Sequence, residues 1–188
     1  MSAVLDLKGV TVRRHPKTIL DAVDWQVNEG ERWVVLGRNG AGKTTLLQIA
    51  SARMHPTAGT ADVLGERLGR VDVFELRPRV GLASAALADR IPGDETVRDV
   101  VLTAAYGVTG RWREEYEEFD AQRADDLLAA FGVDHLADRT FGTLSEGERK
   151  RTQIARALMP DAALVLLDEP AARRDLGGRA ARLAARAP

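Results

Sequence analysis

The sequence predicts an α/β fold with a mainly parallel core sheet, an antiparallel β layer at the N-terminus and an inserted helical subdomain. Three observations support this. Residues 32–36 form an apolar, β-rich stretch that leads through a glycine-rich loop into a helical pattern. Residues 163–167 are a continuous apolar run, which is typical of a parallel strand buried on both faces. Residues 87–143, between these two stretches, are largely of helical type.

The composition indicates a globular protein. Of the 188 residues, 45% are hydrophobic and 29% are charged, and the net charge of -1 gives no basic field that would attract nucleic acid. Cysteine is absent, which excludes disulfides and thiolate metal sites. The N-terminus lacks the pattern of a signal peptide, and no stretch approaches the ~20 apolar residues of a membrane span. We therefore expect a cytoplasmic protein that could reach a membrane only through a partner.

The first third of the chain is expected to be rich in strands. Residues 4–12 alternate loosely, and residues 18–20 and 24–27 predict two short strands. Residues 28–31 predict a turn before the strand at residues 32–36, which is expected to be buried. Together these elements form the antiparallel β layer that leads into the loop.

The loop fits the pattern G-x-x-x-x-G-K-[ST] at every fixed position. Its glycines allow backbone N–H groups to curl around a phosphate chain, and the following helix points its positive end at the same anion. A lysine charge for the β- and γ-phosphates and a hydroxyl for Mg²⁺ complete the motif. The alternative is a glycine-rich turn that matches by chance. The candidate nucleotide-binding residues are Gly37, Arg38, Asn39, Gly40, Ala41, Gly42, Lys43, Thr44 and Thr45.

The middle of the chain predicts strands at residues 61–65 and 79–83, then helices at residues 96–106 and 111–131. Gly132 is a plausible end for the second helix. In that helix, the spacing of Trp112, Tyr116 and Phe119 predicts core positions. Its many glutamates predict a solvated face.

Near residue 144 the pattern returns to the α/β core. Ser145 and Glu148 have the spacing of a capping box at the start of a helix over residues 149–159. The apolar run at residues 163–167 then delivers Asp168 and Glu169 to the carboxyl end of the sheet, where ligands bind in open α/β folds.

The order of these motifs resembles the ATPase domain of ABC transporters, which have a P-loop NTPase fold. The discriminating motif is Leu144-Ser145-Glu146-Gly147-Glu148, which resembles the family signature L-S-G-G-Q. Glu146 and Glu148 replace the second glycine and the glutamine. The resemblance covers essentially Leu5 to Asp175.

The resemblance implies that the chain binds ATP and Mg²⁺. Thr44 and Asp168 are then the metal ligands, and Glu169 is the catalytic residue that polarises the attacking water. Ser145, Glu146, Gly147 and Glu148 act in trans, on the nucleotide of a homodimer or of a paired ABC domain. The further implied partner is a membrane-spanning permease, which would hold the chain on the inner face of the plasma membrane; nucleic acid is not expected.

Several positions depart from the family pattern. Arg14 stands where an aromatic residue usually stacks on adenine, so either its guanidinium stacks there or Arg13 and Arg14 are simply a charged turn. At Ser84-Ala85 the usual glutamine is absent. Family members continue with another strand and a histidine that contacts the γ-phosphate. This chain stops at Pro188 without them, so we expect the C-terminal part of the sheet to be missing.

The expected organisation is one ATPase domain. Its α/β core spans residues 1–86 and 144–175, its helical subdomain residues 87–143, and a truncated tail residues 176–188. The leading function is ATP hydrolysis that powers a transporter through ATP-driven dimerisation. One alternative is ATP binding with lost or weak hydrolysis, and another is an ABC ATPase that is not tied to a membrane.

Overall fold

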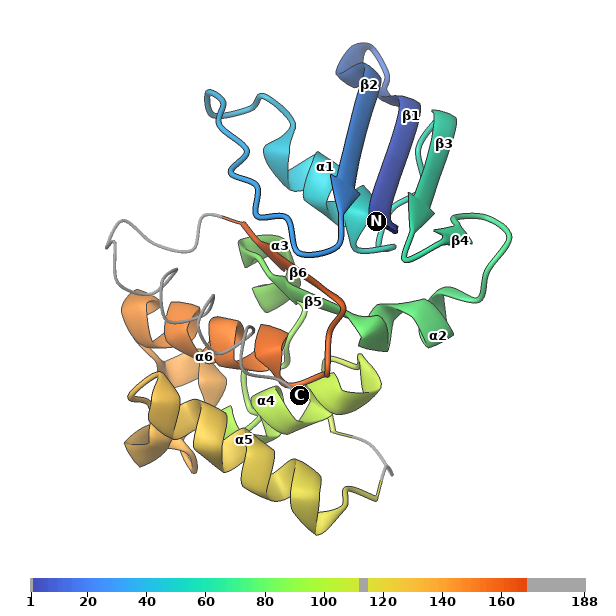
Figure 1. Ribbon diagram of the computed structural model, residues 1–188. Coiled ribbons are helices and arrows are strands. Elements are labelled where there is room, and N and C mark those ends of the chain that lie inside the picture. The colour runs from blue at the N-terminus through green and yellow to red at the C-terminus, as the bar shows by residue number, and fades with distance from the viewer. Residues whose placement is uncertain (1, 112–114, 169–188) are drawn as a thin grey trace. The chain divides into compact units, whose positions relative to one another are not determined.

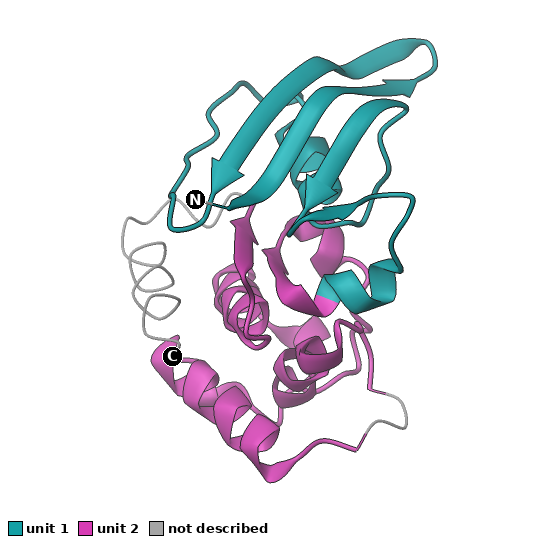
Figure 2. Ribbon diagram, turned by 45° about the vertical axis from the view of Figure 1, so that its right-hand side comes forward, with its two compact units in different colours: residues 1–77 teal, residues 78–188 magenta. Residues whose placement is uncertain are grey.

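The computed structural model describes residues 2–111 and 115–168. The chain divides into two compact units, Met1–Arg77 and Pro78–Pro188, which Figure 2 draws in different colours. The predicted catalytic residue Glu169, the predicted core position Trp112 and the tail at residues 176–188 lie outside the described residues. The domain boundaries expected from the sequence stay a prediction.

The first unit is built on a four-stranded antiparallel sheet with the order β2-β1-β3-β4 (Figure 1). The predicted antiparallel layer is therefore confirmed. The strands are β1 (Ala3–Arg14), β2 (Lys17–Asn28), β3 (Ala58–Val63) and β4 (Glu66–Arg67). The prediction of two short strands was wrong in its division, because β2 runs unbroken. Between the two predicted strands, β2 has a register irregularity against β1 and a positive φ of 46° at Ala22.

Two helices complete the first unit, α1 (Lys43–Ala50) and α2 (Val73–Leu76). The apolar side of α1 packs against β2 and β3, with Leu46 and Ile49 buried. This packing fixes the start of α1, and with it the loop at residues 37–42, relative to the sheet.

The prediction of a buried strand at residues 32–36 was wrong. This segment is irregular in the structure, and Trp33, Val34 and Leu36 expose 56%, 80% and 87% of their surface. An apolar run becomes a strand only where its N–H and C=O groups meet a neighbouring strand. None of the described strands pairs with it: the sheet of the first unit has the order β2-β1-β3-β4, and β5 pairs with β6. The ring of Trp33 instead lies edge-on to Trp25, with centroids 6.2 Å apart.

The second unit contains a parallel pair, β5 (Val80–Ala83) and β6 (Leu164–Leu167). The sequence predicted a mainly parallel core sheet. Among the described residues, two parallel strands of it are present. Helix α6 (Glu146–Leu158) packs directly on β5. A Cβ at Gly81 would lie 2.0 Å from the carbonyl oxygen of Ala157, so only glycine permits this close approach.

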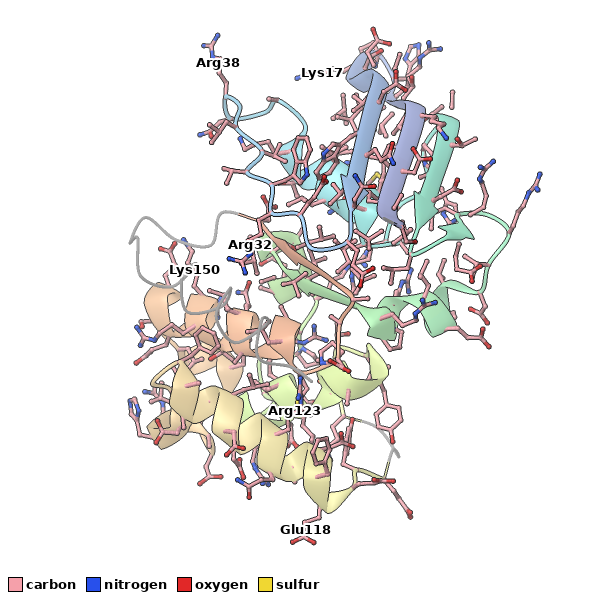
Figure 3. The ribbon with its side chains drawn as sticks, viewed as in Figure 1. Lys17, Arg32, Arg38, Glu118, Arg123 and Lys150 are labelled. Carbon is pink, nitrogen blue, oxygen red and sulfur yellow. The ribbon has the colours of Figure 1, made fainter. Side chains whose placement is uncertain are left out.

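Between β5 and α6, the described residues form the α-helices α3 (Ala85–Ala88), α4 (Val97–Leu102) and α5 (Glu118–Ala130), together with short 3-10 turns. Helices α4, α5 and α6 pack on one another (Figure 1). Arg123 of α5 caps the end of α6, because its guanidinium donates to the carbonyl oxygens of Leu158 and Met159 at 3.1 and 2.8 Å (Figure 3). The shared core is mainly apolar, with Val97, Val101, Ala124, Leu128, Ile154 and Ala155 buried.

Helix α5 begins later than the sequence predicted. Residues 115–117 are irregular, and the helix starts at Glu118. Phe119 exposes 70% of its surface, so its predicted core position was wrong, whereas Tyr116 packs against the core. The predicted end is confirmed: Gly132 follows the helix with a φ of 65°.

Candidate functional site

The glycine-rich loop of the first unit runs from Gly37 to Gly42 and ends as the N-cap of α1. Gly40 and Gly42 have φ values of 79° and 89°, which residues that carry a Cβ rarely adopt. The amide of Ala41 donates to the carbonyl of Arg38 at 3.1 Å, which closes a turn inside the loop. These dihedral angles turn the backbone sharply just before the helix begins.

Strand β2 lies directly against this loop at Gly42. A Cβ at Gly42 would lie 2.8 Å from Cδ2 of Leu20 and 3.0 Å from the carbonyl oxygen of Ile19. The loop therefore rests directly on the strand and can do so only with glycine. The sequence places Ile19 and Leu20 in a strand but does not reveal their contact with the loop, because a contact across more than twenty residues leaves no local signal.

The start of α1 is open to an anion. Gly42 offers no side chain to cap the helix, and its first turn holds no acidic residue. The first N–H groups of a helix lack partners within the helix and carry its positive end. The Lys43 ammonium lies back against the loop, donating to the carbonyl oxygens of Gly37 and Arg38 at 2.8 and 3.1 Å. Arg38 extends outward from the loop (Figure 3).

In the second unit, Asp168 lies at the carboxyl end of β6, as predicted. Its amide donates to the carbonyl of Ala83 at 2.8 Å, so the ends of β5 and β6 bring Ser84 and Asp168 into adjacent positions. Ser84 is buried, and its hydroxyl accepts the amide of Leu87 at 3.2 Å as the N-cap of α3. That hydroxyl therefore caps α3, at the position where the glutamine of the family pattern is absent.

Helix α6 begins with the predicted capping box. The Ser145 hydroxyl accepts the amide of Glu148 at 3.4 Å, and the Glu148 carboxylate reaches back to the amide of Ser145 at 2.7 Å. The same carboxylate oxygen also accepts the Ser145 hydroxyl proton at 2.7 Å. These bonds, with smaller contributions from the charges of Arg139 and Arg151, lower the pKa of Glu148.

Gly147 in the first turn of α6 is not required by the described fold. A Cβ there would meet nothing within 4 Å, and its φ is not in the left-handed region. Gly147 also lies on the exposed surface, as do Ser145 and Glu146. The start of α6 therefore leaves room for another molecule to approach its backbone.

Arg14 lies at the last position of β1 and pairs with Lys17 across the hairpin turn. Its side chain is exposed. Its predicted stacking on adenine stays a prediction.

The predicted magnesium ligands suit that metal by their chemistry. Thr44 offers an exposed hydroxyl one residue into α1, and Asp168 offers a carboxylate. Mg²⁺ prefers hard oxygen ligands and commonly takes one or two from the protein and the rest from phosphates and water. The described residues hold no cluster of three or more His, Cys, Asp or Glu that could bind a metal.

Comparison with known proteins identifies the family. A model of the ABC transporter family matches residues 20–172, from the middle of β2 to just beyond β6. The chain is an ABC transporter ATP-binding cassette. The match includes the phosphate loop, the start of α6 and Asp168, so the motifs belong to one family and do not coincide by chance.

Curated relatives of this cassette include ABC transporter ATP-binding proteins. The uncharacterized ABC transporter ATP-binding protein YlmA of Bacillus subtilis is 40% identical over 89% of this chain and 63% of its own length. The ferric enterobactin transport ATP-binding protein FepC of Escherichia coli is 35% identical over 81% of this chain and 55% of its own length. The cassette thus spans roughly three-fifths of these two relatives.

Solved structures show the same fold. The ATP-binding cassette MJ0796, solved as a dimer bound to ADP and Pi, superposes with a TM-score of 0.81 at 22% identity, over 95% of this chain and 80% of that one. The ATP-binding cassette fold expected from the sequence is therefore confirmed at this level. Within the part of the chain that the structure describes, no helix is long and apolar enough to cross a membrane.

Proposed function

We propose that this cassette binds MgATP at its phosphate loop and hydrolyses it to power an ABC transporter. The observation that carries the proposal is the loop itself. Two glycines with left-handed φ values lead into a helix whose N-terminus has no side-chain cap and no acidic neighbour. Such a helix start attracts phosphate through its free N–H groups and its positive end. Lys43 lies beside it and supplies the charge for the β- and γ-phosphates.

Thr44 and Asp168 are the proposed magnesium ligands. When bound, the metal offsets the negative charge that develops on the phosphates during transfer. Asp168 is supported by its place at the carboxyl end of β6, the end at which α/β folds bind ligands. Glu169, which follows it in the chain, is proposed to polarise the attacking water, by resemblance to the family.

A second copy or a paired cassette is the proposed partner in this reaction. The exposed start of α6, with Ser145 and Gly147, would face the γ-phosphate held by that partner. The room beside Gly147 supports this proposal, since nothing inside the described chain requires a glycine there. A membrane-spanning permease would couple closure of the dimer to transport and hold the cassette at the cytoplasmic face of the membrane.

The test is ATP turnover by the purified chain in the presence of Mg²⁺, measured over a range of protein concentrations. Turnover per molecule should rise with protein concentration, because the proposed active form is a dimer. Glu169→Gln should abolish turnover and retain binding, whereas Lys43→Ala should abolish binding of a fluorescent ATP analogue. Stoichiometric binding without turnover would leave the chain an ATP-binding protein without hydrolysis, and unchanged affinity in Lys43→Ala would overturn the phosphate site.

A further inference from the structure

The two helices whose starts are proposed to meet a phosphate, α1 in its own copy and α6 in a second copy, start in opposite ways. Helix α1 has no side-chain cap and no acidic residue in its first turn. Helix α6 has a complete capping box and two acidic residues, Glu146 and Glu148, in its first turn. One helix start is thus left free for an anion, while the other already holds a carboxylate of its own chain.

The two glutamates of α6 are not equivalent. Glu146 points to solvent, with 83% of its side chain exposed, and pairs with Lys150 one turn further along at 3.0 Å. Glu148 turns back to Ser145 and accepts both its amide and its hydroxyl proton at 2.7 Å. Only Glu148 therefore acts directly on the serine that would contact a phosphate.

A serine hydroxyl has a single proton to donate. While that proton points to Glu148, the hydroxyl presents only lone pairs to any other group, and lone pairs repel a phosphate oxygen. Turning the proton toward a phosphate removes one of the bonds that hold the Glu148 carboxylate in place. It also leaves that negative charge beside a negatively charged ligand, which is unfavourable in its own right.

We propose that Glu148 is a positioning residue that restrains nucleotide-driven pairing of the cassette by holding the Ser145 hydroxyl proton. This inference rests on the proposed function, in which the start of α6 meets the γ-phosphate bound by a second copy. The Glu148 carboxylate competes with that phosphate for the hydroxyl proton of Ser145. It weakens the paired state and leaves nucleotide binding by the single chain unchanged, because Ser145 contacts no nucleotide in its own copy.

Glu148→Gln isolates the effect. A glutamine side-chain oxygen can still accept from the Ser145 amide, so the helix keeps a cap, but the residue has lost its charge and holds the hydroxyl less tightly. Glu146→Gln is the matched control. Glu146 belongs to the same motif, but its side chain points to solvent and does not bond to Ser145, so the substitution removes the same charge from the same helical turn without changing the Ser145 hydroxyl. Ser145→Ala, alone and together with Glu148→Gln, completes a double-mutant cycle.

The measurement is the self-association constant, obtained by sedimentation velocity with a non-hydrolysed ATP analogue and Mg²⁺. Affinity of each single chain for a fluorescent ATP analogue is measured in parallel. Glu148→Gln should strengthen self-association by roughly five- to tenfold, a modest change on the affinity scale. Glu146→Gln should change it by less than about twofold, as expected for an exposed charge. In the Ser145→Ala background, Glu148→Gln should lose most of its effect.

Three results would overturn the inference: no gain in Glu148→Gln, an equal gain in Glu146→Gln, or an undiminished gain without the Ser145 hydroxyl. In each case the wild-type chain would still associate with nucleotide, so the proposed function would stand. If the wild-type chain and all variants bind the analogue and none associates, the proposed pairing fails, and the inference fails with it. Association of Glu148→Gln alone would be the strongest support.

Discussion

At the scale of single residues, Gly42 links the nucleotide site to the fold. It combines a φ of 89° with a close approach to Leu20 and Ile19 of β2. Gly40, two residues earlier, has a similar φ of 79°, but a Cβ there would meet nothing within 4 Å. A substitution at Gly40 therefore tests backbone strain alone, whereas one at Gly42 tests backbone strain together with a steric clash.

We expect Gly42→Ala to lower the free energy of unfolding by more than Gly40→Ala does. Both substitutions place a Cβ on a left-handed backbone, which costs about 1–3 kcal/mol. Gly42→Ala must in addition displace Leu20 or the Ile19 carbonyl, which adds about 1–3 kcal/mol, as in overpacked cores. Urea denaturation of both variants checks this difference. Equal losses would show that the loop does not depend on its contact with β2.

The residues of the site differ in how far the sequence could predict them. The glycine-rich turn into α1 and the capping box of α6 are local patterns whose partners lie within a few positions, so the sequence predicted both of these structures. The contact of Ile19 and Leu20 with Gly42 could not be predicted, since it depends on how β2 packs against the loop. The commitment of the Ser84 hydroxyl to the cap of α3 was likewise hidden, because a serine after a strand suits a cap or a ligand equally.

At the scale of elements, the second unit depends on how α4 and α5 are joined. Arg98 of α4 and Asp125 of α5 form a two-pronged ion pair, with both N–O distances at 2.7 Å. The hydrogen bonds from Arg98 lower the pKa of Asp125. Because the side chains are 40% and 44% exposed, solvent screens much of this interaction.

We expect Asp125→Asn to reduce stability at neutral pH by no more than about 1 kcal/mol. A carboxyl whose pKa is lower in the folded state stabilises the fold above its unfolded pKa of about 3.9. That stabilisation is lost as the pH falls through the folded pKa, so wild type and variant should converge in acid. Urea denaturation at pH 7 and in steps down to pH 3 tests this. Asp126→Asn is the control, because Asp126 accepts a hydrogen bond from Gln122 of its own helix. An equal loss there would contradict a link between α4 and α5.

Elements also show where sequence patterns stop being informative. The run at residues 164–167 became a strand because β5 lies beside it, while the equally apolar residues 33–36 did not, because no described strand pairs with them. Hydrophobicity predicts that a segment prefers burial. Whether it is buried depends on whether another element of the fold packs or pairs with it. The late start of α5 and the exposure of Phe119 follow the same rule, since helical spacing alone does not place a partner against each apolar position.

At the scale of the whole molecule, residues 33–36 form an exposed apolar segment. Trp33, Val34 and Leu36 are consecutive or nearly so, and each exposes more than half of its surface. Extended apolar segments without a strand partner are templates for pairing with other chains. By contrast, Phe74 on α2 is also 73% exposed but lies in a separate helix. Arg32 and Arg38, which flank the segment, are labelled in Figure 3.

We expect Val34→Lys to reduce nucleotide-independent aggregation without lowering the melting temperature. A charge in the middle of the segment opposes strand pairing between chains, and a side chain already 80% exposed loses little burial when it is replaced. Light scattering against protein concentration, without nucleotide, measures the effect, and Phe74→Lys provides a control in which a similar charge enters outside the segment. If Val34→Lys instead lowers the melting temperature by more than about 4 °C, which corresponds to over 1 kcal/mol in a chain of this size, residues 33–36 are buried in solution. The buried strand that the sequence predicts would then be the correct description of this segment.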